Sequence, residues 1–193
     1  MSRLLRKRFA DLKRFAREKR GATAVEFALI SIPFLLLLFG VVEIGMLLLV
    51  SATLDTAVEF ASRNVRTGEF QQSAGVDADS FKGLVCRNMT WLQNSCENSP
   101  RVVVEAETFD NFADLGAANS PDPTTFDPDD RCWSVGGPKD IVLMRVYYQW
   151  DLITPMLNNA LENMGDGRRM LVSASAFRNE PYDPNIEKVG AGC

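Results

Sequence analysis

The residues that could carry chemistry in this chain are four cysteines and a few carboxylates in unusual places. The 193-residue sequence contains no histidine, which removes the commonest general base and metal ligand from consideration. It also lacks a nucleophile elbow, a phosphate-binding loop and a dinucleotide fingerprint. We therefore predict that the chain is not an enzyme and needs no cofactor.

The cysteines indicate disulfides in an oxidising compartment. All four lie in the acidic part of the chain, at Cys86, Cys96, Cys132 and Cys193. Four cysteines permit three pairings. Proximity in the sequence favours Cys86 with Cys96, and Cys132 could then join Cys193. A bridge between Cys86 and Cys132 is the alternative, and non-reducing peptide mapping would reveal it.

Acidic residues also gather in one stretch of the chain. Hard cations such as calcium take clustered carboxylates, and the candidates here are Asp122, Asp127, Asp129 and Asp130. Their spacing does not follow the usual twelve-residue pattern of a calcium loop. We predict no metal site.

Charge divides the chain into blocks. Residues 1–21 hold nine basic and two acidic residues, a net charge of +7, whereas the remainder holds 12 basic and 23 acidic residues, a net charge of −11. The positive-inside rule then places the N-terminus in the cytoplasm and the acidic part outside. We predict a basic leader over 1–21, a long helix over 22–68 and an extracytoplasmic domain over 69–193.

An apolar stretch from Ala28 to Val50 predicts a transmembrane helix. Its 23 residues contain one charge, and at about 1.5 Å rise per residue they span roughly 30 Å of hydrocarbon. A secretory signal cut after Ala52 is the alternative, but the apolar region of such a signal is normally about 7 to 15 residues long. A helical stripe continues to Gly68 through Leu54, Ala57, Val58, Ala61 and Val65.

Glu43 lies inside this apolar stretch, where an acid near the helix centre costs on the order of 2.5–3.5 kcal/mol. Two interpretations follow. Glu43 could be neutral, or close enough to the interface to reach water. Alternatively, it could contact another helix in an assembly, with Gly40 and Gly45 allowing close approach. The sequence leaves both open.

The most specific string is RGATAVEF, from Arg20 to Phe27. Gly21 leaves the backbone unrestricted for an extended approach to a protease. A cut after Gly21 would remove the leader and create an amine on Ala22, about one helical turn from the Glu26 carboxylate. The string resembles the prepilin peptidase site of type IV prepilins, in which a glycine ends the leader and a glutamate is the fifth mature residue.

A closer resemblance is to the TadE-like minor pilins, or pseudopilins, of the tight-adherence (Flp) pilus system. It depends on three strings: RGATAVEFALISIPFLLLLFG, LDTAVEFASRNVRTGEF and SASAFRNEPY. The resemblance implies a single-pass protein of a bacterial inner membrane with a periplasmic C-terminal domain, which could also enter the extracellular pilus. The implied roles are assembly, priming or adhesion, and the family's functional residues correspond to Gly21, Ala22 and Glu26. We predict assembly contacts at Glu26, Phe27 and Glu43.

The implied partners are a prepilin peptidase, other pilins and minor pilins, the inner-membrane assembly platform and the lipid bilayer. No nucleic-acid partner is predicted, because an apolar stripe in the leader favours a helix lying against anionic lipid. The competing hypothesis is a membrane-anchored periplasmic binding or interaction protein that is not incorporated into a pilus.

The extracytoplasmic region predicts an α+β fold, in which the long transmembrane helix packs on a small antiparallel sheet as in pilin-like proteins. Periodicity predicts helices over Asp79 to Ser95 and Pro155 to Met164, the second capped by Thr154. A long surface loop is expected from Ala113 to Pro138. β-rich runs predict strands at Val102–Phe109, Ile141–Trp150 and Met170–Phe177.

Overall fold

The computed structural model describes residues 21–73, 75–97, 99–118, 120–154 and 157–182. The predicted leader therefore lies outside the described residues apart from Gly21, and so does Cys193. The chain divides into two compact units, one ending at Val42 and the other beginning at Glu43. Each unit is described by itself.

Helix α2 (Ala22–Arg66) supplies all the described structure of the first unit after Gly21. Among the residues that the structure describes, it is the one helix long and apolar enough to cross a membrane. In the first unit its large apolar side chains are exposed, including those of Val25, Phe27, Leu29, Ile30 and Leu37. Such a surface is typical of a helix that faces lipid or other helices.

The second unit buries one face of the same helix. The predicted stripe is confirmed, because Leu54, Ala57, Val58, Ala61 and Val65 are all buried in the hydrophobic core. Leu47 and Val50 are buried too, so the last part of the predicted 28–50 span contributes to the packing of this unit. A signal-type cut after Ala52 would separate core residues on either side of it.

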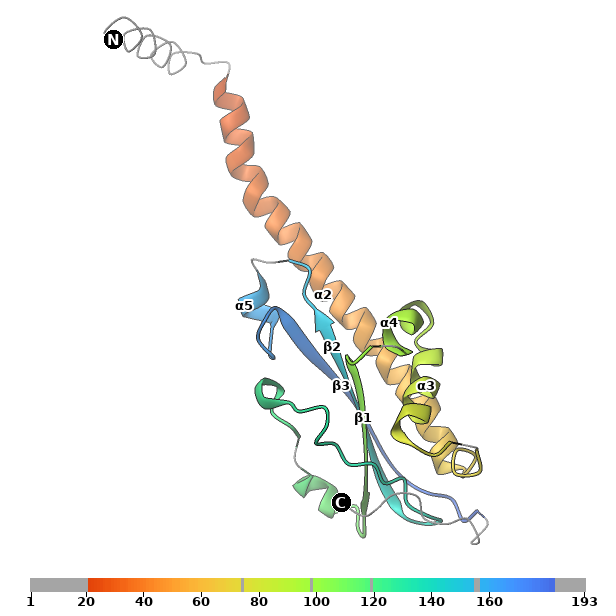
Figure 1. Cartoon of the computed structure of the whole chain (residues 1–193). Coiled ribbons are helices and arrows are strands. Elements are labelled where there is room, and N and C mark those ends of the chain that lie inside the picture. Colours follow the sequence, from red (N-terminus) through yellow and green to blue (C-terminus); the bar gives the residue numbers. More distant parts are fainter. Residues whose placement is uncertain (1–20, 74, 98, 119, 155–156, 183–193) are drawn as a thin grey trace, which may run out of the picture. The chain divides into compact units, whose positions relative to one another are not determined.

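The sheet has three antiparallel strands in the order β1-β2-β3, as Figure 1 shows. The strands are β1 (Val102–Phe109), β2 (Ile141–Asp151) and β3 (Arg168–Arg178), which confirms the three predicted runs within two residues at each end. One face of the sheet, including Val104, Met144 and Val146, shares the hydrophobic core with α2. The α+β prediction is therefore confirmed.

The predicted helix from Asp79 to Ser95 is wrong in its continuity. The structure breaks it into α3 (Ala78–Asn88), a 3-10 turn (Thr90–Leu92) and α4 (Gln93–Glu97). Thr90 has a positive φ of 34°, which a continuous helix does not allow. An unbroken helix would separate Cys86 and Cys96 by roughly 15 Å, whereas their Cα atoms are 5.4 Å apart in a disulfide. The first predicted cysteine pair is thus confirmed.

The second predicted cysteine pair joins Cys132 to Cys193. Cys132 is in a disulfide. Its predicted partner, Cys193, lies outside the described residues.

The predicted surface loop from Ala113 to Pro138 is only partly a surface loop. Its first half is mostly exposed and includes two 3-10 turns, Asp114–Ala117 and Pro123–Thr125. Its second half pairs with β1, because Ala106 donates to the Cys132 carbonyl and accepts from the Ser134 amide, and Val135 is fully buried. Backbone pairing with β1 and burial of Val135 hold this half of the segment in place.

A buried ionic cluster connects the other face of the sheet to this loop. The Arg145 guanidinium contacts the Glu105 and Glu107 carboxylates at 2.9 and 2.6 Å, and the Tyr147 hydroxyl donates to Glu105 at 2.6 Å. Arg131, from the loop, pairs with Glu105 at 3.5 Å. Burial, followed by the hydrogen bond to Glu105, raises the pKa of Tyr147 well above its usual range. These contacts fix the loop to the sheet.

The second predicted short helix is also smaller than expected. Helix α5 covers only Asn158–Leu161, and residues 155–156 of the predicted range lie outside the described residues. Thr154 is not its cap. The Thr154 hydroxyl instead donates a hydrogen bond to the Glu43 carboxylate.

Candidate membrane and assembly segment

The predicted cleavage junction lies at the first residues of α2. The helix begins at Ala22, and Gly21 is exposed, with no atom near the position that a Cβ would occupy. Gly21 itself has 3-10 helical structure, so the bond between Gly21 and Ala22 joins it directly to α2. Because Gly21 is exposed and has no side chain, the bond that follows it is sterically open to a protease.

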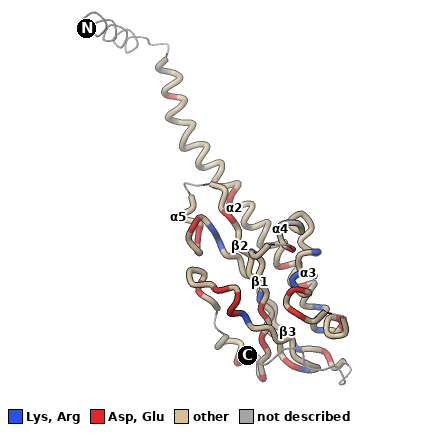
Figure 2. Tube along the Cα trace, in the orientation of Figure 1, with Lys and Arg blue, Asp and Glu red and all other residues tan. Residues whose placement is uncertain are grey.

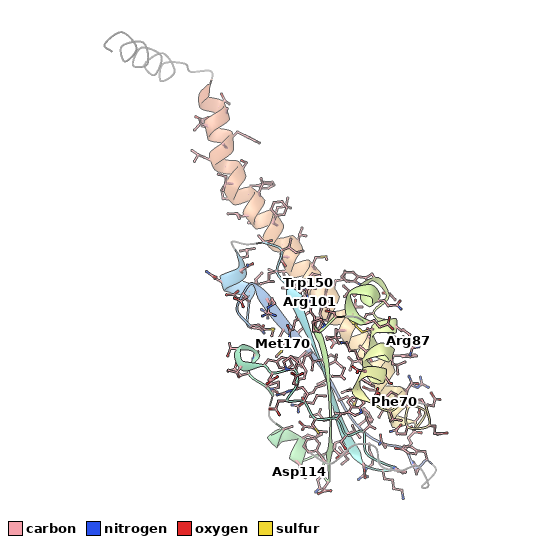
Figure 3. The ribbon with its side chains drawn as sticks, in the orientation of Figure 1. Phe70, Arg87, Arg101, Asp114, Trp150 and Met170 are labelled. Atoms are coloured by element: carbon pink, nitrogen blue, oxygen red, sulfur yellow. A yellow bond between two sulfur atoms is a disulfide. The ribbon has the colours of Figure 1, made fainter. Side chains whose placement is uncertain are left out.

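Glu26 and Phe27 follow one turn later, and both side chains are exposed. Glu26 has no hydrogen-bond or ion-pair partner among the described residues. Figure 2 shows how little charge the first half of α2 carries, and Figure 3 shows its side chains projecting outward. An ionisable group in such an apolar setting needs a partner, which the described part of the chain does not provide.

Glu43 is in the opposite situation. It is only 2% exposed, and its carboxylate accepts hydrogen bonds from the Ile153 and Thr154 amides and from the Thr154 hydroxyl, at 3.0 Å to Oε2 in each case. These donors lie in the turn that follows β2. Three donors on one carboxylate satisfy it within the chain, and hydrogen bonds to a charged acceptor are the strong ones.

This contact is one that the sequence analysis missed. The sequence suggests that Glu43 is neutral or reaches water, or that it contacts another helix. In the structure its hydrogen-bond partners are Ile153 and Thr154, 110 and 111 residues away in the same chain. Two features of the sequence point to this contact: an acid in an apolar stretch that needs hydrogen-bond donors, and Thr154 with its hydroxyl. The prediction that Thr154 caps the following helix gave this hydroxyl a different partner.

Two further strings of the sequence meet at the C-terminal end of α2. Gly68 has φ +82°, and a Cβ there would lie 2.5 Å from the Tyr182 ring. The Glu180 amide donates to the Arg66 carbonyl at 2.9 Å, and the side chains of this pair are 3.4 Å apart. The strings SRNVRTGEF and FRNEPY, far apart in the sequence, therefore form one helix terminus.

Two aspartates of the acidic loop accept local hydrogen bonds. Asp122 accepts from Thr124, and Asp127 accepts from the Asp129 amide. Within the described residues, no three side chains of the His, Cys, Asp and Glu types are grouped to hold a metal.

Together these features define a class of protein: a single-pass membrane anchor, formed by the one N-terminal apolar helix that the described residues contain, joined to a small α+β unit. The family model described as TadE-like protein matches residues 21–63. No curated protein matches the chain, and no solved structure matches it.

The match confirms the resemblance to TadE-like proteins over the N-terminal segment. It begins at Gly21 and includes Ala22, Glu26, Phe27 and Glu43, although it covers less than a quarter of the chain. The TadE-like family implies a protein associated with the tight-adherence pilus and typically a structural one. The sheet lies wholly outside the matched segment.

Proposed function

We propose that this chain is a minor pilin, or pseudopilin, that acts in the assembly, priming or tip adhesion of a tight-adherence pilus. A prepilin peptidase cuts it after Gly21, and it then contacts other pilins through the N-terminal half of α2. Its role is structural rather than enzymatic. The periplasmic unit follows the helix and remains outside the inner membrane.

The observation that carries the proposal is the contrast between Glu26 and Glu43, the two acids of α2 that lie in or beside its apolar stretch. Glu43 has three donors within the chain, whereas Glu26 has no partner among the described residues and lies on an exposed apolar helix. A carboxylate left unpaired in a membrane setting is expensive unless another molecule supplies a cation. The N-terminal amine of a neighbouring processed subunit has the matching charge.

The test is recovery of the protein with sheared pili from cells that carry wild-type or Glu26→Gln protein. The variant removes the charge and keeps the side-chain volume, so we expect normal membrane insertion and a loss of the protein from the pilus fraction. The matched control is Glu59→Gln, which neutralises an exposed acid of the same helix in the second unit.

Recovery of Glu26→Gln at the wild-type level would contradict the proposed contact. Absence of the wild-type protein from both the pilus fraction and cross-links to other pilins would favour the membrane-anchored interaction protein instead. Cross-linking in the membrane distinguishes an assembly factor from a fibre component, because the assembly factor would be linked to pilins without being sheared.

A further inference from the structure

We propose that the turn Leu152–Thr154 is a second membrane-contact site, held at the outer surface of the bilayer by Glu43. The occupant that we assign to it is the lipid headgroup region, and the contact fixes how deeply α2 sits. The inference rests on the membrane anchoring described above and adds a contact outside the helix.

The surface of the turn is apolar at Ile153. Ile153 is 66% exposed although its own amide donates to the buried Glu43 carboxylate. Nearby on the helix, Ile44, Leu48 and Leu49 are also exposed. Two segments distant in the sequence thus bring apolar side chains to the same depth along α2, where a water-exposed surface would be expected to be polar.

The length of α2 before Glu43 also places the turn near the bilayer surface. The part of α2 before Glu43, from Ala22 to Val42, extends roughly 31 Å at about 1.5 Å per residue, which is close to the roughly 30 Å hydrocarbon core of a bilayer. Glu43 is also the first residue of the second unit. The outer end of the span therefore falls near Glu43 rather than at Val50, the end predicted from the sequence.

The hydrogen bonds of Glu43 suit a position at the edge of the hydrocarbon. A carboxylate at the edge of the hydrocarbon has few waters to solvate it, and the turn replaces them with two amides and a hydroxyl. The same contacts leave the Ile153 and Thr154 amides satisfied at a depth where an unpaired N–H is costly. Glu43 supplies the acceptor and the turn supplies the donors, so both groups are satisfied without water at the bilayer surface.

The experiment measures tryptophan quenching in the full-length protein reconstituted in phosphatidylcholine brominated near the headgroup end of its acyl chains. Ile153→Trp places a reporter on the turn. Phe112→Trp is the matched control, because Phe112 is also exposed and follows the end of β1, which pairs with the start of β2, whereas Ile153 follows the end of β2. Figure 3 labels Asp114 and Trp150, which mark these two ends of the sheet. Emission of the three native tryptophans is subtracted with the wild-type protein.

We expect the added emission of Ile153→Trp to be blue-shifted and quenched, and that of Phe112→Trp to be neither. Equal, low quenching of the two would overturn the inference. Phe34→Trp tests the anchoring separately, because a reporter in the span must be quenched by lipid brominated deep in the chain. If Phe34→Trp is quenched and Ile153→Trp is not, the membrane anchor stands and the second contact fails.

The Glu43 contact is tested by adding Glu43→Gln or Thr154→Val to Ile153→Trp. Both remove part of the hydrogen bonding, and Thr154→Val is the smaller change to the second unit. We expect loss of the headgroup-level quenching while protease resistance of the second unit is retained. Unchanged quenching in both variants would refute the role of Glu43. Quenching that disappears as the protein-to-lipid ratio rises would show that a second copy, not lipid, covers Ile153.

Discussion

At the scale of single residues, Glu26 and Glu43 of α2 differ in role: Glu43 stabilises the chain, and Glu26 is available to a partner. Glu43 is enclosed by donors from the turn after β2, and Glu26 is exposed on an apolar helix. The sequence identified both as unusual, but it could not distinguish their roles. The donors of Glu43 are mainly backbone amides, and no residue type marks them in a sequence.

Replacement of Glu43 by glutamine should destabilise the second unit. Hydrogen bonds to a charged group contribute about 1.5–3 kcal/mol, so we expect a loss of that order in the free energy of unfolding. Urea unfolding in detergent micelles, followed by tryptophan fluorescence, measures it. Glu26→Gln is the control, and it should leave the unfolding curve unchanged. Equal curves for Glu43→Gln and the wild type would contradict this assignment.

Tyr147 makes the stability of the second unit sensitive to high pH. Burial and the hydrogen bond to Glu105 raise the pKa of this hydroxyl above its ordinary value of 10.0. The protonated hydroxyl therefore contributes its full stabilisation to the folded state below pH 10. This contribution is lost as the pH rises toward the pKa of the folded state. Tyr148 and Tyr182 have raised pKa values for the same first reason, burial.

The corresponding variant is Tyr147→Phe, which removes the hydroxyl and leaves Glu105 with fewer donors. We expect a loss of about 1–3 kcal/mol at neutral pH and a smaller decline in stability above pH 10 than in the wild type. Unfolding free energies measured from pH 7 to pH 11 test both parts. If the free energy of unfolding falls as steeply with pH in the variant as in the wild type, Tyr147 is not the main source of the pH dependence.

At the scale of elements, side-chain periodicity correctly predicted the helix face and the strands that pack in the core. It did not predict where a tertiary contact interrupts a helix. The apolar stripe of α2 and the three strands follow from regular side-chain alternation, and the structure confirms them. The break at Thr90 was not predicted, because the apolar positions continue through it at helical spacing. The disulfide between Cys86 and Cys96 requires that break, so the two sequence predictions were mutually inconsistent.

The helix terminus at Gly68 gives a direct test of the contact between two distant strings. Gly68→Ala imposes a left-handed conformation on an L-residue, which costs roughly 1–2 kcal/mol, and the new methyl would also meet the Tyr182 ring. Gly83→Ala is the matched control, because Gly83 lies within α3 with open space around it. That change should stabilise α3 by about 0.5–1 kcal/mol.

Thermal or urea unfolding of the two alanine variants would decide the point. A Gly68→Ala protein as stable as the Gly83→Ala protein would show that the helix end tolerates a side chain. We expect the free energy of unfolding to fall in Gly68→Ala and to rise in Gly83→Ala.

At the scale of the whole molecule, the chain combines an apolar helix that directly follows the exposed Gly21 with a disulfide-bearing α+β unit. The class of protein could be predicted from the sequence, because charge blocks, helix length and the Gly21 to Glu26 spacing are local features. The attachment of the turn after β2 to Glu43 could not, because it joins residues 110 positions apart. The TadE-like match covers the Gly21 to Glu26 spacing and stops within the helix.

Processing of the leader tests the central claim most directly. Mass spectrometry of the N-terminus should be carried out on wild-type and Gly21→Leu protein from cells that contain the prepilin peptidase. The account predicts that the wild-type protein begins at Ala22 and that the variant keeps residues 1–21. A wild-type protein that keeps its leader in those cells, or begins at any residue other than Ala22, would contradict it.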